Sequence, residues 1–529
     1  MSLDVGPRAA TSATSRLVSQ EDPATVTDTT IASPAARADA ARHGRPFPQD
    51  FLFGAATAAF QIEGAAFDGG RTASIWDAFC RVPGAVVNAD NGDVACDHYH
   101  RMPADVALMK GLGLQTYRFS TSWSRVRPDG GPVNPAGVDF YSRLVDELLG
   151  AGIKPWLTLY HWDLPQALEE RGGWANRDTA FLFRDYALTM HDALGDRVDV
   201  WTTLNEPWCS SFLSYTAGAH APGRQSKADG LAAAHHLMLG HGLAVEALRS
   251  RAGSGSGSGM RSGSRPALEL GITLNLTVAK PVDPARPGDV DAARRIDAQF
   301  NRVFLDPIFR GAYPADLVAD LDAAGLGSTL ESVVHDGDLA VISTPIDTLG
   351  VNYYHGELVS DRPAADPLPA QAPTSRPTSS PFPAADDVFN HPQGLPLTAM
   401  DWEVQPVGLT ELLRRVHDEY TDAPGVKLYV TENGAAYDDV VEADGSVADV
   451  ARAEFLVDHL GAILDAIDGG VPVHGYFYWS LMDNFEWAWG YDKRFGLVRV
   501  DYDTQERTVK QSGHTYARVI AARALPSVE

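Results

Sequence analysis

Two glutamates in this chain follow short strand-like runs and could together perform acid–base and nucleophilic chemistry. Residues 198–204 (VDVWTTL) are rich in β-branched and aromatic side chains, and Glu206 follows just before a proline that cannot extend a strand. Residues 427–431 (KLYVT) have the same character, and Glu432 precedes an Asn-Gly turn signal. If the fold joins these strand ends, the two carboxyl groups form the pair that glycoside hydrolysis uses. The alternative is two unrelated surface glutamates, because carboxylates are common where loops begin.

The order of strands and helices predicts a fold that would bring these two strand ends together. Strand-like runs alternate with helical patterns, which indicates parallel pairing and favours an α/β fold closed as a single (β/α)8 TIM barrel with extended βα loops. The strand-like runs are residues 51–57, 115–121, 154–160, 198–204, 268–274, 348–354, 427–431 and 473–480. The helical patterns include residues 181–193, 231–249, 292–304, 409–419 and 451–467. An open doubly wound sheet is the competing fold, but no Gly-rich phosphate fingerprint follows any strand.

Segments of biased composition flank and interrupt this alternation. Residues 1–45 are rich in Ala, Thr, Ser, Pro and Asp without an apolar signal region, which predicts a disordered tail before a catalytic barrel over residues 46–522. A Gly/Ser-rich insert at residues 253–264 is expected on the bottom of the barrel, where it would be functionally neutral. A Pro-rich loop at residues 361–400 follows the sixth strand and is therefore expected on the active face.

Composition excludes several classes of partner. The formal net charge of −26 and the sequence pI near 4.9 argue against nucleic acid or an anionic membrane surface as a partner. No run of about 18 apolar residues is present, which argues against a membrane span. Cys80, Cys96 and Cys209 are too few for a disulfide framework in 529 residues and are predicted to be structural. A reducing, cytoplasmic location is therefore expected, whereas the oligomeric state is not predicted.

The expected strand ends carry polar and aromatic side chains besides the two glutamates. Catalytic groups of such barrels lie at the C-terminal ends of the strands. Amides, an imidazole, a phenol and indoles suit the hydroxyls and the apolar face of a sugar. In chain order they are Gln61, Arg118, His161, Trp162, Asn205, Asn352, Tyr354 and Trp479. Neither pair of neighbouring histidines, at 98 and 100 or at 235 and 236, has the spacing of a shared helix face, so no metal or other cofactor is predicted.

The motifs that carry these residues resemble, in order, those of family 1 of the glycoside hydrolases, which contains β-glucosidases, β-galactosidases and 6-phospho-β-glycosidases. They are residues 53–64 (FGAATAAFQIEG), 117–120 (YRFS), 160–165 (YHWDLP), 204–207 (LNEP), 350–354 (GVNYY), 430–434 (VTENG) and 479–487 (WSLMDNFEW). The resemblance covers about residues 46–521, without the tail, the Gly/Ser-rich insert or most of the Pro-rich loop. It departs at Val407, where relatives usually carry Glu, and at Leu204, where Phe or Ile is usual.

The resemblance implies a retaining β-glucosidase that acts by double displacement on terminal β-D-glucosyl residues of small unphosphorylated β-glycosides or oligosaccharides. Glu206 would be the acid/base and Glu432 the nucleophile, with Arg118 and Tyr354 orienting the nucleophile. Activity on β-galactosides or β-fucosides, and transglycosylation, remain open. A sugar-binding barrel without turnover is the rival from another class, and the presence of both glutamates argues against it.

The resemblance also implies a substrate-binding set. Its members are Gln61, His161, Asn205, Asn352, Trp402, Trp479, Glu486 and Trp487. Trp479 would be the stacking platform and Trp402 would face the aglycone. A carboxylate at Glu486 suits free 4- and 6-hydroxyls and would repel a 6-phosphate. For each of these residues the alternative is an ordinary structural role, as a satisfied core histidine, a core aromatic or a structural ion pair.

Overall fold

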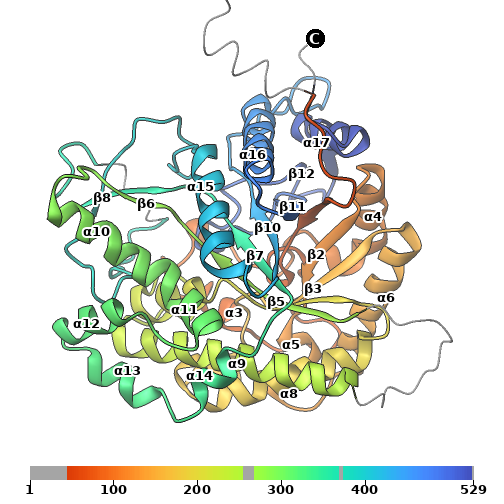
Figure 1. The fold of residues 1–529 in the computed structure, drawn as a ribbon. Helices are drawn as coiled ribbons and strands as arrows, with labels where there is room; N and C mark the ends of the chain where they lie inside the picture. Colours follow the sequence, from red (N-terminus) through yellow and green to blue (C-terminus); the bar gives the residue numbers. More distant parts are fainter. Residues whose placement is uncertain (1–43, 254–266, 368–372, 527–529) are drawn as a thin grey trace, which may run out of the picture. The chain divides into compact units, whose positions relative to one another are not determined.

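Eight parallel strands form a closed barrel at the centre of the computed structural model, which describes residues 44–253, 267–367 and 373–526 (Figure 1). β1 pairs with both β2 and β11, which closes the ring. The strands are β1 (Leu52–Ala56), β2 (Thr116–Ser120), β3 (Lys154–Tyr160), β4 (Val200–Asn205), β5 (Glu269–Asn275), β7 (Thr348–Asn352), β10 (Lys427–Asn433) and β11 (Val473–Trp479). The predicted (β/α)8 barrel is confirmed.

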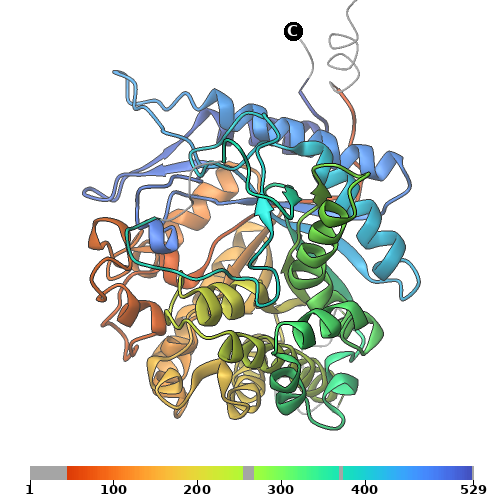
Figure 2. The same ribbon diagram turned by 90° about the vertical axis from the view of Figure 1, so that its left-hand side faces the viewer.

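The helices lie outside the strands in both views (Figures 1 and 2). The longer ones are α4 (His98–Gly111), α6 (Pro135–Ala151), α8 (Asp178–Leu194), α9 (Lys227–Gly253), α10 (Pro287–Asp297), α11 (Val303–Arg310), α12 (Ala315–Ala323), α15 (Pro406–Val416), α16 (Val450–Asp468) and α17 (Gln511–Ala522). The short ones are α2 (Ala59–Ile62), α3 (Ile75–Phe79), α5 (Trp123–Val126), α7 (Gln166–Glu169), α13 (Gly327–Val333) and α14 (Asp338–Ile342). Among the described helices, none has both the length and the apolar character needed to cross a membrane.

α6 illustrates how the sequence defines these helices. Its first residue is a proline, whose fixed φ suits the first turn, and the Asn134 side chain accepts a hydrogen bond from the Ala136 N–H. Its apolar side chains, including Phe140 and Leu144, are buried against the barrel. The helix ends at Ala151, and the next residue, Gly152, has a φ of 78° that is accessible to glycine without steric cost. The following strand, β3, begins two residues later.

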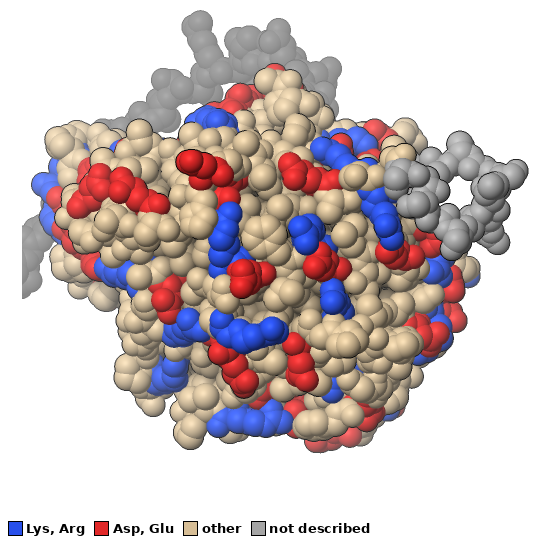
Figure 3. All heavy atoms as spheres, turned by 90° about the horizontal axis from the view of Figure 1, so that it is seen from below, with Lys and Arg blue, Asp and Glu red and all other residues tan. Residues whose placement is uncertain are grey.

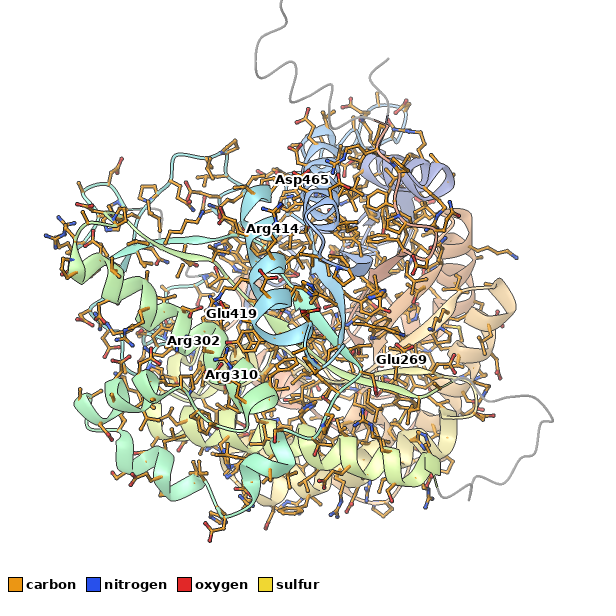
Figure 4. All side chains as sticks on the ribbon, viewed as in Figure 1. Glu269, Arg302, Arg310, Arg414, Glu419 and Asp465 are labelled. Atoms are coloured by element: carbon orange, nitrogen blue, oxygen red, sulfur yellow. The ribbon has the colours of Figure 1, made fainter. Side chains whose placement is uncertain are left out.

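Several elements differ from the sequence-based prediction. The single helix predicted over residues 292–304 is α10 and the start of α11, separated by a π-helical turn, η5 (Ala298–Arg302). Ion pairs hold this stretch to α15, because Asp297 accepts hydrogen bonds from Arg302 at 2.7 Å and from Arg415 at 2.5 Å. Arg415 also pairs with Glu419 at 3.1 Å, and Figure 4 labels Arg302 and Glu419. On the face seen in Figure 3, basic and acidic side chains are interspersed.

Two small sheets outside the barrel have no counterpart in the prediction. One contains β6 (Ala279–Pro281), β8 (Glu357–Ser360) and β9 (Phe389–Asn390), and the other contains β12 (Val498–Val500) and β13 (Arg507–Val509). These strands have at most four residues, which is too short for an alternating pattern to stand out.

Residues 374–376 of the Pro-rich loop contact loops that follow β1 and β4. The hydroxyl of Thr374 donates to the carbonyl of Gly84 at 2.6 Å. The Arg376 guanidinium donates to the carbonyls of Gly218 and Gly223. These hydrogen bonds attach the segment to βα loops. Its predicted place on the active face stays a prediction. The predicted tail and the Gly/Ser-rich insert lie almost entirely outside the described residues.

Candidate active site

The predicted site residues come together because parallel strands bring their C-terminal ends to one side of the barrel. Arg118 lies in β2, Asn205 ends β4, Asn352 ends β7, Glu432 lies in β10 and Trp479 ends β11. The others follow directly: Gln61 in α2 after β1, His161 after β3, Glu206 after β4, Tyr354 after β7, and Glu486 and Trp487 after β11. Their arrangement defines one polar cluster with aromatic walls.

Glu432 is held by two donors. Its Oε1 accepts a hydrogen bond from Arg118 Nη1 at 2.6 Å, and its Oε2 accepts one from the Tyr354 hydroxyl at 2.8 Å. Burial raises the pKa of Glu432, while the charge and hydrogen bond of Arg118 and the hydrogen bond of Tyr354 oppose that rise. Both oxygens therefore face groups that stabilise the ionised carboxylate.

Glu206 occupies a different environment. Its φ of 48° lies in the left-handed region, and its N–H donates to the Thr273 carbonyl at 2.9 Å, which helps to hold this strained backbone. Asn352 Nδ2 donates to Glu206 Oε1 at 2.5 Å. Burial, followed by the negative charge of Glu432, raises the pKa of Glu206 to about 8. At neutral pH this carboxyl group therefore holds its proton, whereas Glu432 faces a guanidinium.

Arg118 sets the direction of the surrounding hydrogen bonds. A guanidinium only donates, so the Asn205 atom 2.6 Å from Arg118 Nη2 is the acceptor Oδ1. Asn205 Nδ2 then faces His161 Nε2 at 3.0 Å, so Nε2 accepts and the ring proton is on Nδ1. Burial lowers the pKa of His161 well below its usual value, which keeps the ring neutral. His161 Nδ1 is buried without a partner among the described residues and is thus a free donor.

Asn352 links the two carboxyl groups through this network. Its Nδ2 lies 3.1 Å from Asn205 Oδ1 as well as near Glu206, and its Oδ1 accepts from the Thr431 hydroxyl at 2.8 Å. The orientation of the Asn352 amide is therefore determined at both ends. Glu206 and Glu432 are consequently held in one hydrogen-bonded unit rather than as independent side chains.

Aromatic rings surround this unit. The Trp479 and His161 rings are stacked, with centroids 5.7 Å apart. Trp487 lies 4.5 Å from Trp162 and stacks on Phe60 at 6.2 Å, centroid to centroid. The Trp402 ring lies 5.2 Å from the ring of Tyr354, centroid to centroid. Such walls suit the apolar face of a sugar.

Gln61 and Glu486 each have one oxygen atom without a partner among the described residues. Gln61 Nε2 donates to Asn484 Oδ1 at 3.0 Å and to the Phe485 carbonyl at 2.8 Å, which ties it to the loop after β11. Among the described residues, Gln61 Oε1 and Glu486 Oε2 are buried atoms without a hydrogen-bond partner. Burial, with the negative charges of Glu432 and Glu206, raises the pKa of Glu486 to about 8. These groups are available to sugar hydroxyls.

Two residues of this cluster are absent from the sequence-based site: Asn484 binds Gln61, and the Cys209 thiol lies 3.1 Å from Glu206 Oε2. Trp162, which the sequence placed at a strand end without a specific role, donates from Nε1 to the Asn205 carbonyl at 2.9 Å. Each lies within a few residues of a predicted site residue, which is the signal that could have indicated them. No cluster of three or more His, Cys, Asp and Glu side chains in the described part of the chain is placed to hold a metal ion.

Comparison with known proteins connects this geometry with one family. The family model for glycosyl hydrolase family 1 matches residues 43–525. A bifunctional beta-D-glucosidase/beta-D-fucosidase from Bifidobacterium breve is 49% identical over 487 residues, covering 90% of this chain and 98% of the relative. A beta-glucosidase from Agrobacterium sp. is 46% identical over 472 residues, covering 89% and 94%.

Solved structures give the same result. The psychrophilic beta-glucosidase BglU from Micrococcus antarcticus has a TM-score of 0.85 and 54% identity, covering 90% of this chain and 98% of that chain. A beta-glucosidase from Thermotoga maritima in complex with deoxynojirimycin has a TM-score of 0.79 and 40% identity, covering 91% and 100%. The similarity therefore extends over the whole barrel.

Proposed function

The chain belongs to glycosyl hydrolase family 1 and is a glycoside hydrolase, and we propose that it is a retaining β-glucosidase in which Glu206 is the acid/base and Glu432 the nucleophile. The observation that carries the proposal is the contrast between the two carboxyl groups. Glu432 faces Arg118 and the Tyr354 hydroxyl, whereas burial and the charge of Glu432 raise the pKa of Glu206 to about 8. A site in which one carboxyl group faces a guanidinium and a phenol while the other holds a proton is equipped to attack and to protonate in the same step.

In the first half-reaction, Glu432 attacks the anomeric carbon while Glu206 donates its proton to the leaving oxygen. The bond from the sugar to the aglycone breaks, and an ester between the sugar and Glu432 forms. Asn205 and the free Nδ1–H of His161 would hold the sugar hydroxyls, and Trp479 would lie against the sugar face. Trp402, beside Tyr354, would border the aglycone.

In the second half-reaction, the same residues exchange roles. Once Glu432 is esterified, the negative charge that raises the pKa of Glu206 is gone. The positive charge of Arg118, which lowers that pKa, remains. Glu206, which has already passed its proton to the leaving oxygen, therefore stays ionised as the weaker base and can accept a proton from the attacking water. If a second sugar replaces water, the same step is transglycosylation.

The first test is to identify the anomer released first. With an aryl β-glucoside, proton NMR is expected to show β-glucose before mutarotation, because two displacements at one carbon restore its configuration. Release of α-glucose would contradict the nucleophilic role of Glu432. A sugar-binding protein would release neither anomer. The B. breve relative, named as both a β-D-glucosidase and a β-D-fucosidase, makes the aryl β-fucoside the second substrate to try.

Glu486→Ser is expected to lower kcat/KM for a neutral aryl β-glucoside by roughly 10- to 100-fold, because the sugar loses the carboxyl group that can hydrogen-bond its hydroxyls. The strongest charges that act on Glu486 come from Glu432 and Glu206. A 6-phosphate would therefore meet negative charge whichever form Glu486 takes. Repulsion of a 6-phosphate therefore does not require an ionised Glu486, although the sequence-based expectation assumed one.

Glu411→Ser is the matched control, since Glu411 is a partly exposed carboxylate that pairs with Lys280 outside the site. Steady-state kinetics of both variants with the glucoside and with its 6-phosphate would decide the role. An unchanged kcat/KM in Glu486→Ser would remove Glu486 from the sugar-binding set. The cytoplasmic location inferred from the cysteine content stays a prediction.

A further inference from the structure

Cys209 and Asn275 form a series of hydrogen bonds that ends at Glu206 and has no role in the two half-reactions. Cys209 begins the π-helical segment η4 (Cys209–Ala217), and its N–H donates to the Glu206 carbonyl at 3.0 Å. This turn places the Cys209 sulfur 3.1 Å from Glu206 Oε2. Asn275, the last residue of β5, has its Nδ2 3.6 Å from the same sulfur. Both Cys209 and Glu206 are buried, with exposed fractions of 6% and 5%.

The amide donors at the two ends of this series, Asn352 and Asn275, determine the direction of its hydrogen bonds. Asn352 Nδ2 can only donate, so Glu206 Oε1 accepts a hydrogen bond whether or not the carboxyl group is ionised. The acid proton of Glu206 is therefore carried by Oε2, the oxygen that faces Cys209. Asn275 Nδ2 likewise only donates, so the sulfur accepts from Asn275 and its own S–H is left for Glu206 Oε2.

We propose that Cys209 is a positioning residue for Glu206, whose ionised Oε2 accepts a hydrogen bond from the Cys209 thiol each time the proton has been transferred. This inference rests on the proposed role of Glu206 as the acid/base. A donor to the charged form stabilises that form, so the thiol holds the pKa of Glu206 lower than burial alone would set it. It also keeps Oε2 turned toward one fixed partner throughout the cycle.

The thiol remains a neutral donor across the working pH range. Burial and the adjacent Glu206 raise the pKa of Cys209 well above its usual value, so the thiolate does not form. The other charged or titratable groups that act on Glu206 come from β2, β10, the stretch after β7 and the loop after β11. They are Arg118, Glu432, Tyr354 and Glu486. None of them changes when Cys209 is replaced.

The test is the pH profile of kcat/KM for an aryl β-glucoside, whose basic limb reports the acid/base of the free enzyme. In Cys209→Ala and Cys209→Val the basic limb is expected to move up by about half a pH unit, since a donor to the carboxylate is lost. Valine fills the space around the sulfur and so excludes a replacement water. Cys209→Ser, which restores a donor, is expected to return the limb to its original position or below it.

Cys80→Ala is the matched control, because Cys80 is a free thiol with the same 6% exposed fraction outside the site. Its profile is expected to match that of the parent enzyme. A basic limb that does not move in either Cys209→Ala or Cys209→Val would overturn the inference. If valine prevents folding, as a loss of cooperative thermal unfolding would reveal, the alanine and serine variants decide.

Glu206→Gln, measured alongside, separates this inference from the proposed function. If Glu206→Gln keeps the basic limb, Glu206 is not the acid/base and the proposed function fails. If Glu206→Gln loses the limb while the Cys209 variants keep it in place, only the role of Cys209 fails.

Discussion

Glu432→Gln is expected to lower kcat for an aryl β-glucoside by roughly 10⁴-fold or more, which corresponds to about 5 kcal/mol of lost transition-state stabilisation. The amide has nearly the shape of the carboxylate but cannot form the glycosyl ester. It also presents only one oxygen to the two donors, Arg118 and Tyr354, that face Glu432. Steady-state and single-turnover kinetics on purified protein would measure the loss.

A second expected result of Glu432→Gln is a lower pKa at Glu206. The negative charge of Glu432 raises that pKa and Arg118 lowers it, so removal of Glu432 leaves a buried guanidinium without its counter-charge. Glu206 then ionises below its original pKa of about 8. Infrared difference spectra of the carboxyl band across a pH titration would report this change.

The control for Glu432→Gln is the same substitution at the opposite end of the barrel. Glu269 begins β5, where it pairs with Lys427 at 2.8 Å, and Figure 4 shows it apart from the labelled helical residues. Glu269→Gln is expected to retain kcat. A Glu432→Gln enzyme with kcat within tenfold of the parent would exclude Glu432 as the nucleophile, provided that its near-ultraviolet circular dichroism is unchanged.

The strands of the barrel could be predicted because each is a short apolar run followed by turn residues. The run over residues 427–431 illustrates both the success and its limit: β10 continues to Asn433, so Glu432 is part of the strand rather than beyond it. Glu432 thus points from the end of the ladder into the polar cluster. A hydrophobic pattern could not show this, because the strand ends in polar residues that are buried by the fold.

The arrangement within the site depended on contacts that sequence spacing does not encode. Cys209 was predicted to be structural, and only the turn after β4 shows its sulfur beside Glu206. The free Nδ1–H of His161 likewise follows from the hydrogen bonds of Arg118 and Asn205, two residues on other strands. Spacing along the chain predicts which strand end carries a side chain, whereas protonation and hydrogen-bond direction arise from neighbours brought close by the barrel.

The loss of kcat/KM in Glu206→Ala is expected to be larger for substrates whose leaving group must be protonated in order to depart. For cellobiose or an alkyl β-glucoside, kcat/KM should fall by roughly 10³-fold or more, since general acid catalysis contributes about 10²–10⁴-fold. For a dinitrophenyl β-glucoside, whose leaving group departs as a stable anion, the loss should be less than about tenfold in kcat/KM. The basic limb of the pH profile should vanish as well. In the parent enzyme the acid form of Glu206 is lost as the pH rises through about 8.

The second half-reaction gives a further, independent expectation for Glu206→Ala. Without a base for the attacking water, the glycosyl ester on Glu432 accumulates, so KM for the dinitrophenyl substrate should fall together with kcat. A small anion such as azide needs no base, and the space left by the Glu206 side chain admits it. Azide should therefore restore turnover and yield a β-glucosyl azide, which mass spectrometry and NMR would identify.

Glu411→Ala, at a partly exposed ion pair, is the control and should show neither effect. Equal losses for both leaving groups, without rescue by azide, would mean that Glu206 supports the fold of the site rather than the proton transfer.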